Sequence, residues 1–455
     1  MDVGRKSEPV EIVEDARLVF RTAPLAIVVL DAEQHPAAAL PPELPHVDGV
    51  QHVPEVEPAR GRRREARQQG AKTIMRGMKQ LLSVALLLIS SAAAMAQSKP
   101  RARDLGVTFD GTPGPLNAIT DVKGLEVGMT TLISGEGALK TGQGPVRTGV
   151  TAILPRGKAS GDPVMAGWFS LNGNGEMTGT TWIEEAGFLE GPVFITNTHS
   201  VGVVRDAAIA WSVKNGKLFQ PWSLPVVAET WDGGLNDING FHVKSDHVFQ
   251  ALDSARGGPV PEGNVGGGTG MVCYEFKCGS GTASRKVADA AGGYTVGVLV
   301  QANHGRRSEL RIAGVRVGRE IPVSRKPAGD PPELGSIIIV VATDAPLLPH
   351  QLQRLARRAS LGLARTGATS GNGSGDIFVA FSTANAGAAA RQDVAQVSML
   401  SNNRISALFS ATVEATEEAI VNALVAAETM TGADNRTVPA LPHPTLRALL
   451  KKYGR

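Results

Sequence analysis

The sequence is poor in aromatic residues and in cysteine, and it offers no apolar run long enough to cross a bilayer as a helix. Its 455 residues include 12 Phe, 5 Trp and 3 Tyr but 53 Gly, which indicates many tight turns and a core packed from small side chains. Two apolar runs near the N-terminus, 23–30 and 81–89, are each too short for a transmembrane helix, so we expect no membrane partner.

Neither sign of charge is in excess. The chain has 46 Lys and Arg against 43 Asp and Glu, a net charge of +3, and no basic stripe stands out in the region expected to fold. Such a stripe normally marks a nucleic-acid-binding surface, so we expect no nucleic-acid partner. The GxGxxG pattern of dinucleotide-binding folds is missing as well.

Only two cysteines are present, Cys273 and Cys278, with four residues between them. In an oxidising compartment the two thiols can pair across a tight hairpin, and buried free thiols are the alternative. Two ligands do not make a zinc site, and no ligand cluster of the usual spacing occurs. We therefore expect no metal or other cofactor, and we assign these cysteines no role.

Residues 1–74 differ from the rest because they are rich in proline and charge and include the basic cluster 60–64. We interpret them as a disordered extension or as the result of a start codon assigned too early, in preference to a basic docking tail. Residues 75–96 have the parts of a secretory signal peptide in order: a positive start, the apolar run 81–89, and the cleavage site Ala94-Met95-Ala96.

This pattern predicts that translation begins at Met75 or Met78 and that the mature chain begins near Gln97. In a Gram-negative bacterium the product would be exported to the periplasm. If the long N-terminus is real, a signal buried so far from the start would work poorly and the protein would stay in the cytoplasm.

The most informative stretch is 333–346, in which Gly335 and Ser336 precede a dense run of β-branched residues typical of a buried strand. If the bond between them is cut, Ser336 carries both a nucleophilic hydroxyl and a free α-amine. The pKa of such an amine is about 7.7–8.0, so on the order of a tenth of it is neutral at pH 7 and able to act as a base. The alternative is an ordinary Gly-Ser turn leading into a core strand.

Short apolar runs between glycine-rich turns predict a mixed, layered α/β domain. Besides the strand after Ser336, we expect strands at 149–154, 164–169, 192–196, 224–229, 294–300 and 377–382. Helices are expected at 204–213, 246–254 with Ser245 as cap, 352–363 ending at Gly367, 408–429 and 445–452.

The strand at Ser336 and the following segment 342–367 resemble the start of the small chain in the self-cleaving serine aminopeptidases. This family includes the β-peptidyl aminopeptidases and the L-aminopeptidase D-amidase/esterases, and the resemblance runs from about Arg101 to the C-terminus. It implies an αββα four-layer sandwich of the N-terminal-nucleophile-hydrolase type, with two β-sheets between helical layers. It also implies a large chain 97–335 and a small chain 336–455.

The resemblance assigns roles to residues that composition and spacing alone would leave as turn or cap residues. Asn303, at the end of a predicted strand, matches an asparagine whose amide stabilises the oxyanion of the tetrahedral intermediate. Ser374 and Asp376 match a serine and a carboxylate that hydrogen-bond toward the nucleophile, and the N–H of Gly375 completes the oxyanion site. The best-known β-peptidyl enzymes have glutamate in place of Asp376, which leaves the role of this shorter side chain open.

Glu229 follows a hydrophobic strand, where a carboxylate is usually just solvated. In the resembled family the matching glutamate binds the free ammonium of the substrate, a contact that is worth about 1.5–3 kcal/mol. Trp231 departs from the D-amidase branch, which has a tyrosine there.

Two further patterns suggest other chemistry. The glycine cluster 263–270 lacks the Gly-Lys-Ser/Thr ending of a phosphate-binding loop, so we expect its backbone to pass close to another chain segment or to a substrate instead. The cluster also matches the GNVGGGTG of the aminopeptidases. His304, next to Asn303, suggests a Ser-His-Asp triad, but the resembled family uses no histidine.

The sequence therefore predicts a self-processing serine aminopeptidase that removes N-terminal residues, β-amino acids such as β-alanine above all, from short peptides and amides. An L-aminopeptidase/D-amino-acid amidase and esterase is the alternative. An acyltransferase resembling the ornithine acetyltransferases is a second, which Ser336 disfavours because those enzymes cut before threonine. An uncut binding protein is a third. The resemblance also implies a homotetramer of α/β heterodimers.

Overall fold

The structure is a computed structural model that describes residues 99–321, 335–390 and 392–455. They belong to one compact unit, Ala92–Arg455. The predictions for the extension 1–74 and the signal peptide 75–96 lie outside the described residues.

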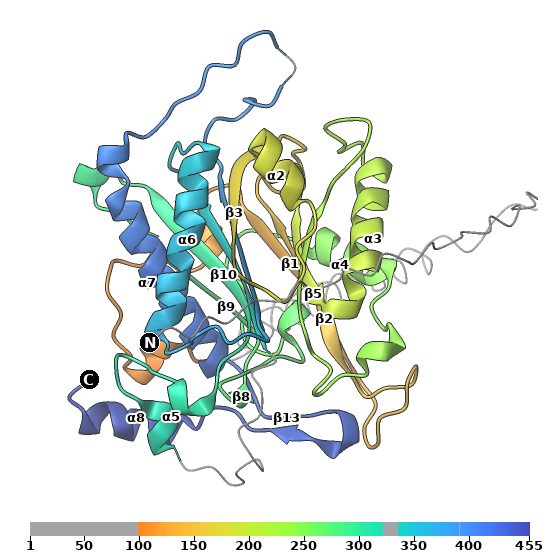
Figure 1. Cartoon of the computed structure of the whole chain (residues 1–455), viewed down its shortest axis with the longest axis vertical. Helices are drawn as coiled ribbons and strands as arrows, with labels where there is room; N and C mark the ends of the chain where they lie inside the picture. Colours follow the sequence, from red (N-terminus) through yellow and green to blue (C-terminus); the bar gives the residue numbers. More distant parts are fainter. Residues whose placement is uncertain (1–98, 322–334, 391) are drawn as a thin grey trace, which may run out of the picture. The chain divides into compact units, whose positions relative to one another are not determined.

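Two β-sheets form the centre of this unit (Figure 1). The first has four strands, and its outer strand β6 is parallel to its neighbour β5 while the other pairs are antiparallel. In spatial order its strands are β1 (Glu126–Ser134), β2 (Val146–Leu154), β5 (Val193–Asn197) and β6 (Val226–Thr230).

The second sheet has six strands and contains Ser336 at the start of a central one. Its order is β4 (Phe188–Leu189), β3 (Val164–Gly173), β12 (Gly375–Ser382), β11 (Ser336–Thr343), β10 (Thr295–Asn303) and β9 (Ser280–Lys286). Only β11 and β12 are parallel, because the helix α6 (Pro349–Arg365) crosses over between them.

Helices cover the outer face of each sheet (Figure 1). α6 and α7 (Ser406–Val425) pack on the six-stranded sheet, and α3 (Val201–Lys214) and α4 (Ser245–Ser254) pack on the four-stranded one. The strand β11 shows the layering: Ile337, Ile339 and Val341 join the core under α6 and α7, whereas Ile338, Val340 and Ala342 join the core between the sheets. This arrangement confirms the αββα sandwich.

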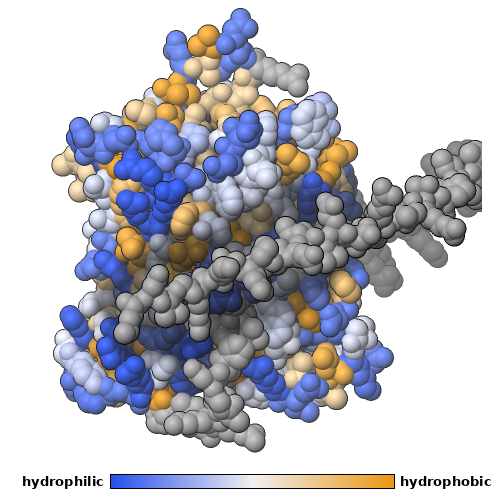
Figure 2. Space-filling model, viewed as in Figure 1, coloured by the Kyte–Doolittle hydropathy of each residue, from blue (hydrophilic) through white to orange (hydrophobic). Residues whose placement is uncertain are grey.

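Smaller elements complete the unit. They are α2 (Thr180–Ala186), α5 (Val317–Glu320), α8 (His443–Lys452), the hairpin β7 (Val272–Cys273) with β8 (Phe276–Lys277), and the pair β13 (Met430–Thr431) with β14 (Thr437–Val438). The segment between β12 and α7 projects at the top of Figure 1, and apolar and hydrophilic side chains are interspersed on the face seen in Figure 2. No helix among the described residues is long and apolar enough to span a membrane.

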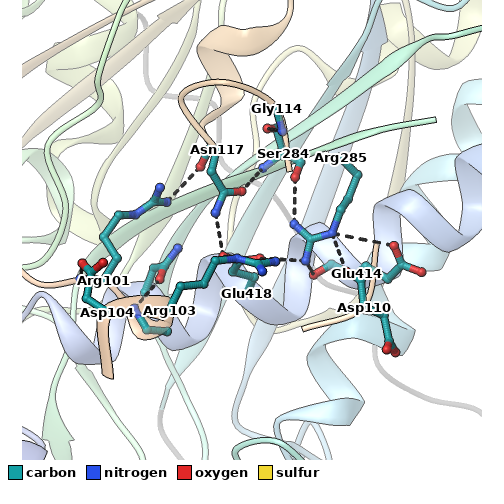
Figure 3. A network of polar contacts seen from close by, with 12 residues as sticks. Arg101, Arg103, Asp104, Asp110, Gly114, Asn117, Ser284, Arg285, Glu414 and Glu418 are labelled. Carbon is teal, nitrogen blue, oxygen red and sulfur yellow. Dashed lines mark hydrogen bonds and ion pairs between the residues drawn. The ribbon is translucent and has the colours of Figure 1, made fainter. Parts of the chain in front are cut away.

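Buried ion pairs tie the N-terminal part of the unit to α7 (Figure 3). Glu418 of α7 is fully buried and accepts hydrogen bonds from Arg103 at 2.7 Å and from Asn117 at 2.6 Å. Arg285 of β9 approaches the same carboxylate at 2.7 Å. If the chain is cut before Ser336, these contacts join the two fragments.

Every strand and helix predicted within the described residues is present, but some bounds differ. Ser245 is the first residue of α4 and Lys244 holds the cap position, so the predicted cap was wrong. α7 ends at Val425, four residues earlier than predicted. The strands β1 and β9 were missed. Small and polar residues fill β9, and in β1 a glycine and two threonines interrupt the apolar residues. In β9 this composition has a packing reason: a Cβ on Gly281 would lie 2.1 Å from the carbonyl oxygen of Ala419 in α7.

Candidate active site

Ser336 lies at the first position of β11, between two strands that each bring a polar group to it. Antiparallel pairing with β10 places Asn303 directly opposite Ser336. On the other side, the backbone N–H of Gly375 in β12 donates to Ser336 Oγ at 3.0 Å. Ser336 is 5% exposed. The sheet thus brings together three residues that are far apart in sequence, and one of them donates to the buried hydroxyl.

The side chains of Ser336 and Asn303 share the sheet face that looks toward the four-stranded sheet. Ser336 has the parity of Ile338, and Asn303 that of Leu299, and both of these pack in the core between the sheets. Directly opposite residues of an antiparallel pair have Cβ atoms about 4.5–5.5 Å apart. This pairing brings the Cβ atoms of Asn303 and Ser336 close together on one face of the sheet.

The amide of Asn303 is oriented by two backbone groups. Its Oδ1 accepts from the N–H of Val272 at 2.8 Å, and its Nδ2 donates to the carbonyl of Trp231 at 2.8 Å. The second hydrogen of Nδ2 has no partner among the residues that the structure describes. Nδ2 thus keeps one hydrogen that it could donate to a group bound at Ser336.

The carboxylate of Asp376 links Ser374 to the backbone beside Ser336. Ser374 Oγ donates to Asp376 Oδ2 at 2.8 Å, and the N–H of Ile337 donates to Asp376 Oδ1 at 3.1 Å. Burial raises the pKa of Asp376, and the hydrogen bonds it accepts oppose that rise. The aspartate is thus long enough to join the network despite the methylene that it lacks relative to glutamate.

The positions of Gly375 and Ser374 depend on a loop that follows β3. A Cβ on Gly375 would lie 2.5 Å from the carbonyl oxygen of Asn174 and 2.6 Å from the Cα of Gly175, so only glycine fits here. Asn172 Nδ2 donates to Ser374 Oγ at 3.2 Å and to the carbonyl of Gly371 at 2.6 Å.

Glu229 is buried rather than solvated, with 3% of its surface exposed. Its Oε1 accepts from the N–H of Glu176 at 3.0 Å, and its Oε2 accepts from the hydroxyl of Thr198. Burial raises its pKa, and these hydrogen bonds oppose the rise. A Cβ on Gly175 would lie 3.2 Å from Glu229 Oε1 and 3.0 Å from the Cα of Gly375, so Glu229 borders the same site.

The glycine cluster 263–270 is a close crossing, as predicted. Its residues Gly266–Gly268 form a short 3-10 helix that is fully buried. A Cβ on Gly267 would lie 2.2 Å from Gln301 Oε1, and one on Gly268 would lie 2.3 Å from the backbone nitrogen of Ser280. The spaces are filled by protein, so no phosphate fits against these backbone N–H groups.

His304 does not pair with the serine. Its ring is buried edge-on against Tyr274, with 5.1 Å between ring centroids, and neither ring nitrogen has a hydrogen-bond partner in the described part of the chain. Burial lowers the pKa of His304 to about 3. A triad base must lie within hydrogen-bond reach of the serine and be basic enough to take its proton. His304 meets neither condition, so that hypothesis is wrong.

The structure also contains site residues that the sequence prediction missed. Asn172 and Thr198 hold Ser374 and Glu229 through side-chain hydrogen bonds, and Val272 and Trp231 hold Asn303 through backbone groups. A backbone group can make the same hydrogen bond whatever the side chain is, so such a contact cannot be recognised from the residue type. Cys273 and Cys278, which the sequence left as either paired or free, form a disulfide. Among the described residues, no cluster of three or more His, Cys, Asp or Glu is able to hold a metal ion.

Known proteins are similar to this chain in sequence and in fold. The chain is 57% identical over 377 residues to the beta-peptidyl aminopeptidase BapA of Sphingosinicella microcystinivorans, an alignment that covers 80% of this chain and 95% of that protein. A beta-aminopeptidase structure from Burkholderia sp. is similar with a TM-score of 0.71 and 50% identity, covering 78% of this chain and 99% of the other.

A second solved structure links the fold to its catalytic class. The L-aminopeptidase D-Ala-esterase/amidase of Ochrobactrum anthropi, described as a prototype of the serine aminopeptidases and a variant of the Ntn hydrolase fold, matches with a TM-score of 0.72 and 50% identity. That match covers 78% of this chain and 99% of the other. The family model for Peptidase family S58 matches residues 117–438. The chain is therefore a member of peptidase family S58, the serine aminopeptidases that autoproteolysis activates.

Proposed function

We propose that the protein cuts its own Gly335–Ser336 bond and then uses Ser336 to remove β-amino acids from the N-termini of short peptides and amides. Two observations support this proposal: the N–H of Gly375 donates to Ser336 Oγ at 3.0 Å, and strand pairing sets Asn303 directly opposite Ser336.

In maturation, Ser336 Oγ attacks the carbonyl carbon of Gly335. The C–N bond breaks, the ester bond forms and the nitrogen gains the proton of the hydroxyl, which is an N-to-O acyl shift. Water then hydrolyses the ester and leaves a carboxylate on Gly335 and a free α-amine on Ser336. The products are the large chain 97–335 and the small chain 336–455.

In turnover, Ser336 Oγ attacks the carbonyl of the substrate's first residue, and the oxyanion that forms accepts hydrogen bonds from Asn303 Nδ2 and the N–H of Gly375. One such donor lowers the barrier by about 3 kcal/mol. The base is either the α-amine of Ser336 or Ser374 acting with Asp376, whose oxygen atoms lie 2.8 Å apart. Glu229 binds the ammonium of the substrate. Collapse of the oxyanion breaks the C–N bond, and the protonated base gives its proton to the leaving amine. Water then hydrolyses the ester, which frees the amino acid and regenerates Ser336.

Two observations bear on the substrate. The high identity to the protein named beta-peptidyl aminopeptidase favours peptides that begin with a β-amino acid. The likeness to the Ochrobactrum anthropi enzyme keeps L-amino-acid amides and D-amino-acid amides and esters as the second candidate.

Assembly and compartment are part of the same proposal. The segment that projects between β12 and α7 exposes Val394, Val397 and Met399, which suits it to contact another copy in a homotetramer of heterodimers. The disulfide between Cys273 and Cys278 fits an oxidising compartment such as the periplasm, to which the segment 75–96 would export the chain.

Intact mass and N-terminal sequencing of the purified protein test the cleavage. Two fragments, one beginning at Ser336, are expected, and the Ser336→Ala variant should remain one chain. Rates on β-alanyl and D-alanyl p-nitroanilides then decide between the substrate classes. A single wild-type chain that stays uncut on long incubation would contradict the proposal.

A further inference from the structure

A small hairpin outside the proposed mechanism touches the catalytic amide. The strands β7 and β8 pair between Cys273 and Phe276, and a disulfide between Cys273 and Cys278 closes the hairpin. Both cysteines are fully buried. The two turn residues, Tyr274 and Glu275, both have positive φ, which is the backbone conformation of a tight two-residue hairpin turn.

The hairpin binds the end of β10 through two backbone N–H groups. That of Tyr274 donates to the carbonyl of His304 at 2.8 Å, and that of Val272 donates to Asn303 Oδ1 at 2.8 Å. Because a backbone N–H can only donate, Asn303 must present its oxygen to Val272 and its nitrogen to the carbonyl of Trp231. A flipped amide would set N–H against N–H and oxygen against oxygen.

Lys277 secures the hairpin on the other side of Val272. Its side chain is fully buried, and Nζ donates to the carbonyls of Met271 and Cys278, each at 2.7 Å. Its backbone N–H donates to the carbonyl of Pro439 at 2.7 Å. Burial lowers the pKa of Lys277 far below the ordinary value. Both neighbours of Val272 are thus fixed: the amine of Lys277 binds the carbonyl of the preceding residue, and the disulfide holds the following residue, Cys273.

We propose that the hairpin closed by Lys277 and the Cys273–Cys278 disulfide is a positioning element for catalysis, which acts by fixing the amide of Asn303 through the N–H of Val272. The inference rests on the proposed role of Asn303 as an oxyanion donor. Such donors act only when they are held in place before the reaction, and a misplacement of about 1 Å can lower the rate on the order of a hundredfold.

The double variant Cys273→Ser/Cys278→Ser tests the proposal. Removing an oxyanion donor outright lowers kcat by about 10²–10³, so a donor that is only loosened should lower it by about tenfold. KM should stay within about twofold, because ground-state binding does not use this contact. Kinetics on the cleaved enzyme separate this effect from any effect on maturation.

A double-mutant cycle separates positioning from general stability. In an Asn303→Ala background the hairpin has no amide left to orient, so the cysteine substitutions should leave kcat unchanged. An equal loss of kcat with and without Asn303 would overturn the proposal, because the disulfide would then act by another route. Wild-type kcat in the double variant would overturn it as well.

Lys277→Met provides an independent test if the cysteine variant does not fold. It should also lower kcat by about tenfold with KM nearly unchanged, by the same loosening of one donor. Lys286→Met is the matched control, since that exposed lysine also donates to two oxygens, of Gly293 at 3.1 Å and of Thr295 at 3.2 Å. Its kcat should equal that of wild type.

A crystal structure distinguishes failure of this inference from failure of the proposed function. If wild-type enzyme shows no turnover, the proposed function fails, and the hairpin is judged by geometry alone. A contact between Val272 N and Asn303 Oδ1 that is kept in wild type and lost in the double variant supports the positioning role. An unchanged amide in the double variant overturns it.

Discussion

Arg285 and Glu418 form an ion pair with 2.7 Å between Nη2 and Oε2, and their side chains are 1% and 0% exposed (Figure 3). Arg285 belongs to β9 and Glu418 to α7, so the pair joins the segments on either side of Ser336. Burial alone would raise the pKa of Glu418, but the hydrogen bond from Arg103 and the charge of Arg285 outweigh it and the pKa is lowered.

Glu418→Gln should therefore loosen the association of the two fragments. Removing one partner from a buried ion pair typically destabilises a protein by about 3–5 kcal/mol, because a charge is left unpaired. Glu417→Gln is the control on the same helix, since its pair with Arg365 at 3.0 Å is partly exposed and should contribute less than about 1 kcal/mol. Denaturant unfolding of both variants gives the comparison, and equal losses would contradict the prediction.

The contribution of Glu418 to the free energy of unfolding should decrease as the pH is lowered. Because its folded-state pKa is lowered from 4.5, the stabilisation is fully present above pH 4.5 and is lost as pH falls through the folded-state value. The difference in unfolding free energy between wild type and Glu418→Gln should thus shrink in acid. A difference that stays constant from neutral to strongly acidic pH would show that the charge of Glu418 is not its source.

Gly335→Ala should strongly slow self-cleavage while Ser336 remains in place. A Cβ on Gly335 would lie 2.1 Å from the carbonyl oxygen of Asn303 and 2.8 Å from the Cα of His304, so the scissile carbonyl would have to move. Moving it by about 1 Å should slow cleavage on the order of a hundredfold. Gly202→Ala in α3 is the control, because a Cβ there meets nothing within 4 Å. The fraction of cut chain over time, measured by intact mass, tests both.

As the pH is lowered, the rate of the mature enzyme should begin to fall at a pH above the usual pKa range of carboxyl groups. Burial raises the pKa of Glu229 from 4.5 and that of Asp376 from 3.8, and both must be ionised to act as proposed. A profile of kcat/KM against pH should therefore have its acid midpoint above 4.5. Glu229→Gln and Asp376→Asn identify the group responsible, and a midpoint at or below 4.5 would contradict the assignment.

The same profile distinguishes the two candidate bases. The α-amine of Ser336 must be neutral to accept a proton, which would place a second limb near its ordinary pKa of about 7.7–8.0. A profile without that limb would favour Ser374 acting with Asp376.

The sequence predicts those parts of the site in which the type of residue itself indicates the structure. The β-branched run after Ser336 could only be a buried strand, and the glycines of 263–270 and Gly375 mark backbone crossings that exclude a Cβ. Contacts through backbone groups carry no such mark, which is why the role of Val272 beside Asn303 was missed. The strand β9 was missed because small polar residues form it, and their burial depends on how closely α7 approaches.

Cutting the chain before Ser336 would create an end in an unusual place. A chain terminus normally frays, and the amides of its first residues exchange readily with solvent deuterium. Here β11 pairs with β10 from Ser336 and with β12 from Ile337, so both ladders hold the severed strand from its second residue. The amides of Ile338 to Val341 should then exchange only at the rate of global unfolding, and a newly made N-terminus would be among the most rigid parts of the molecule.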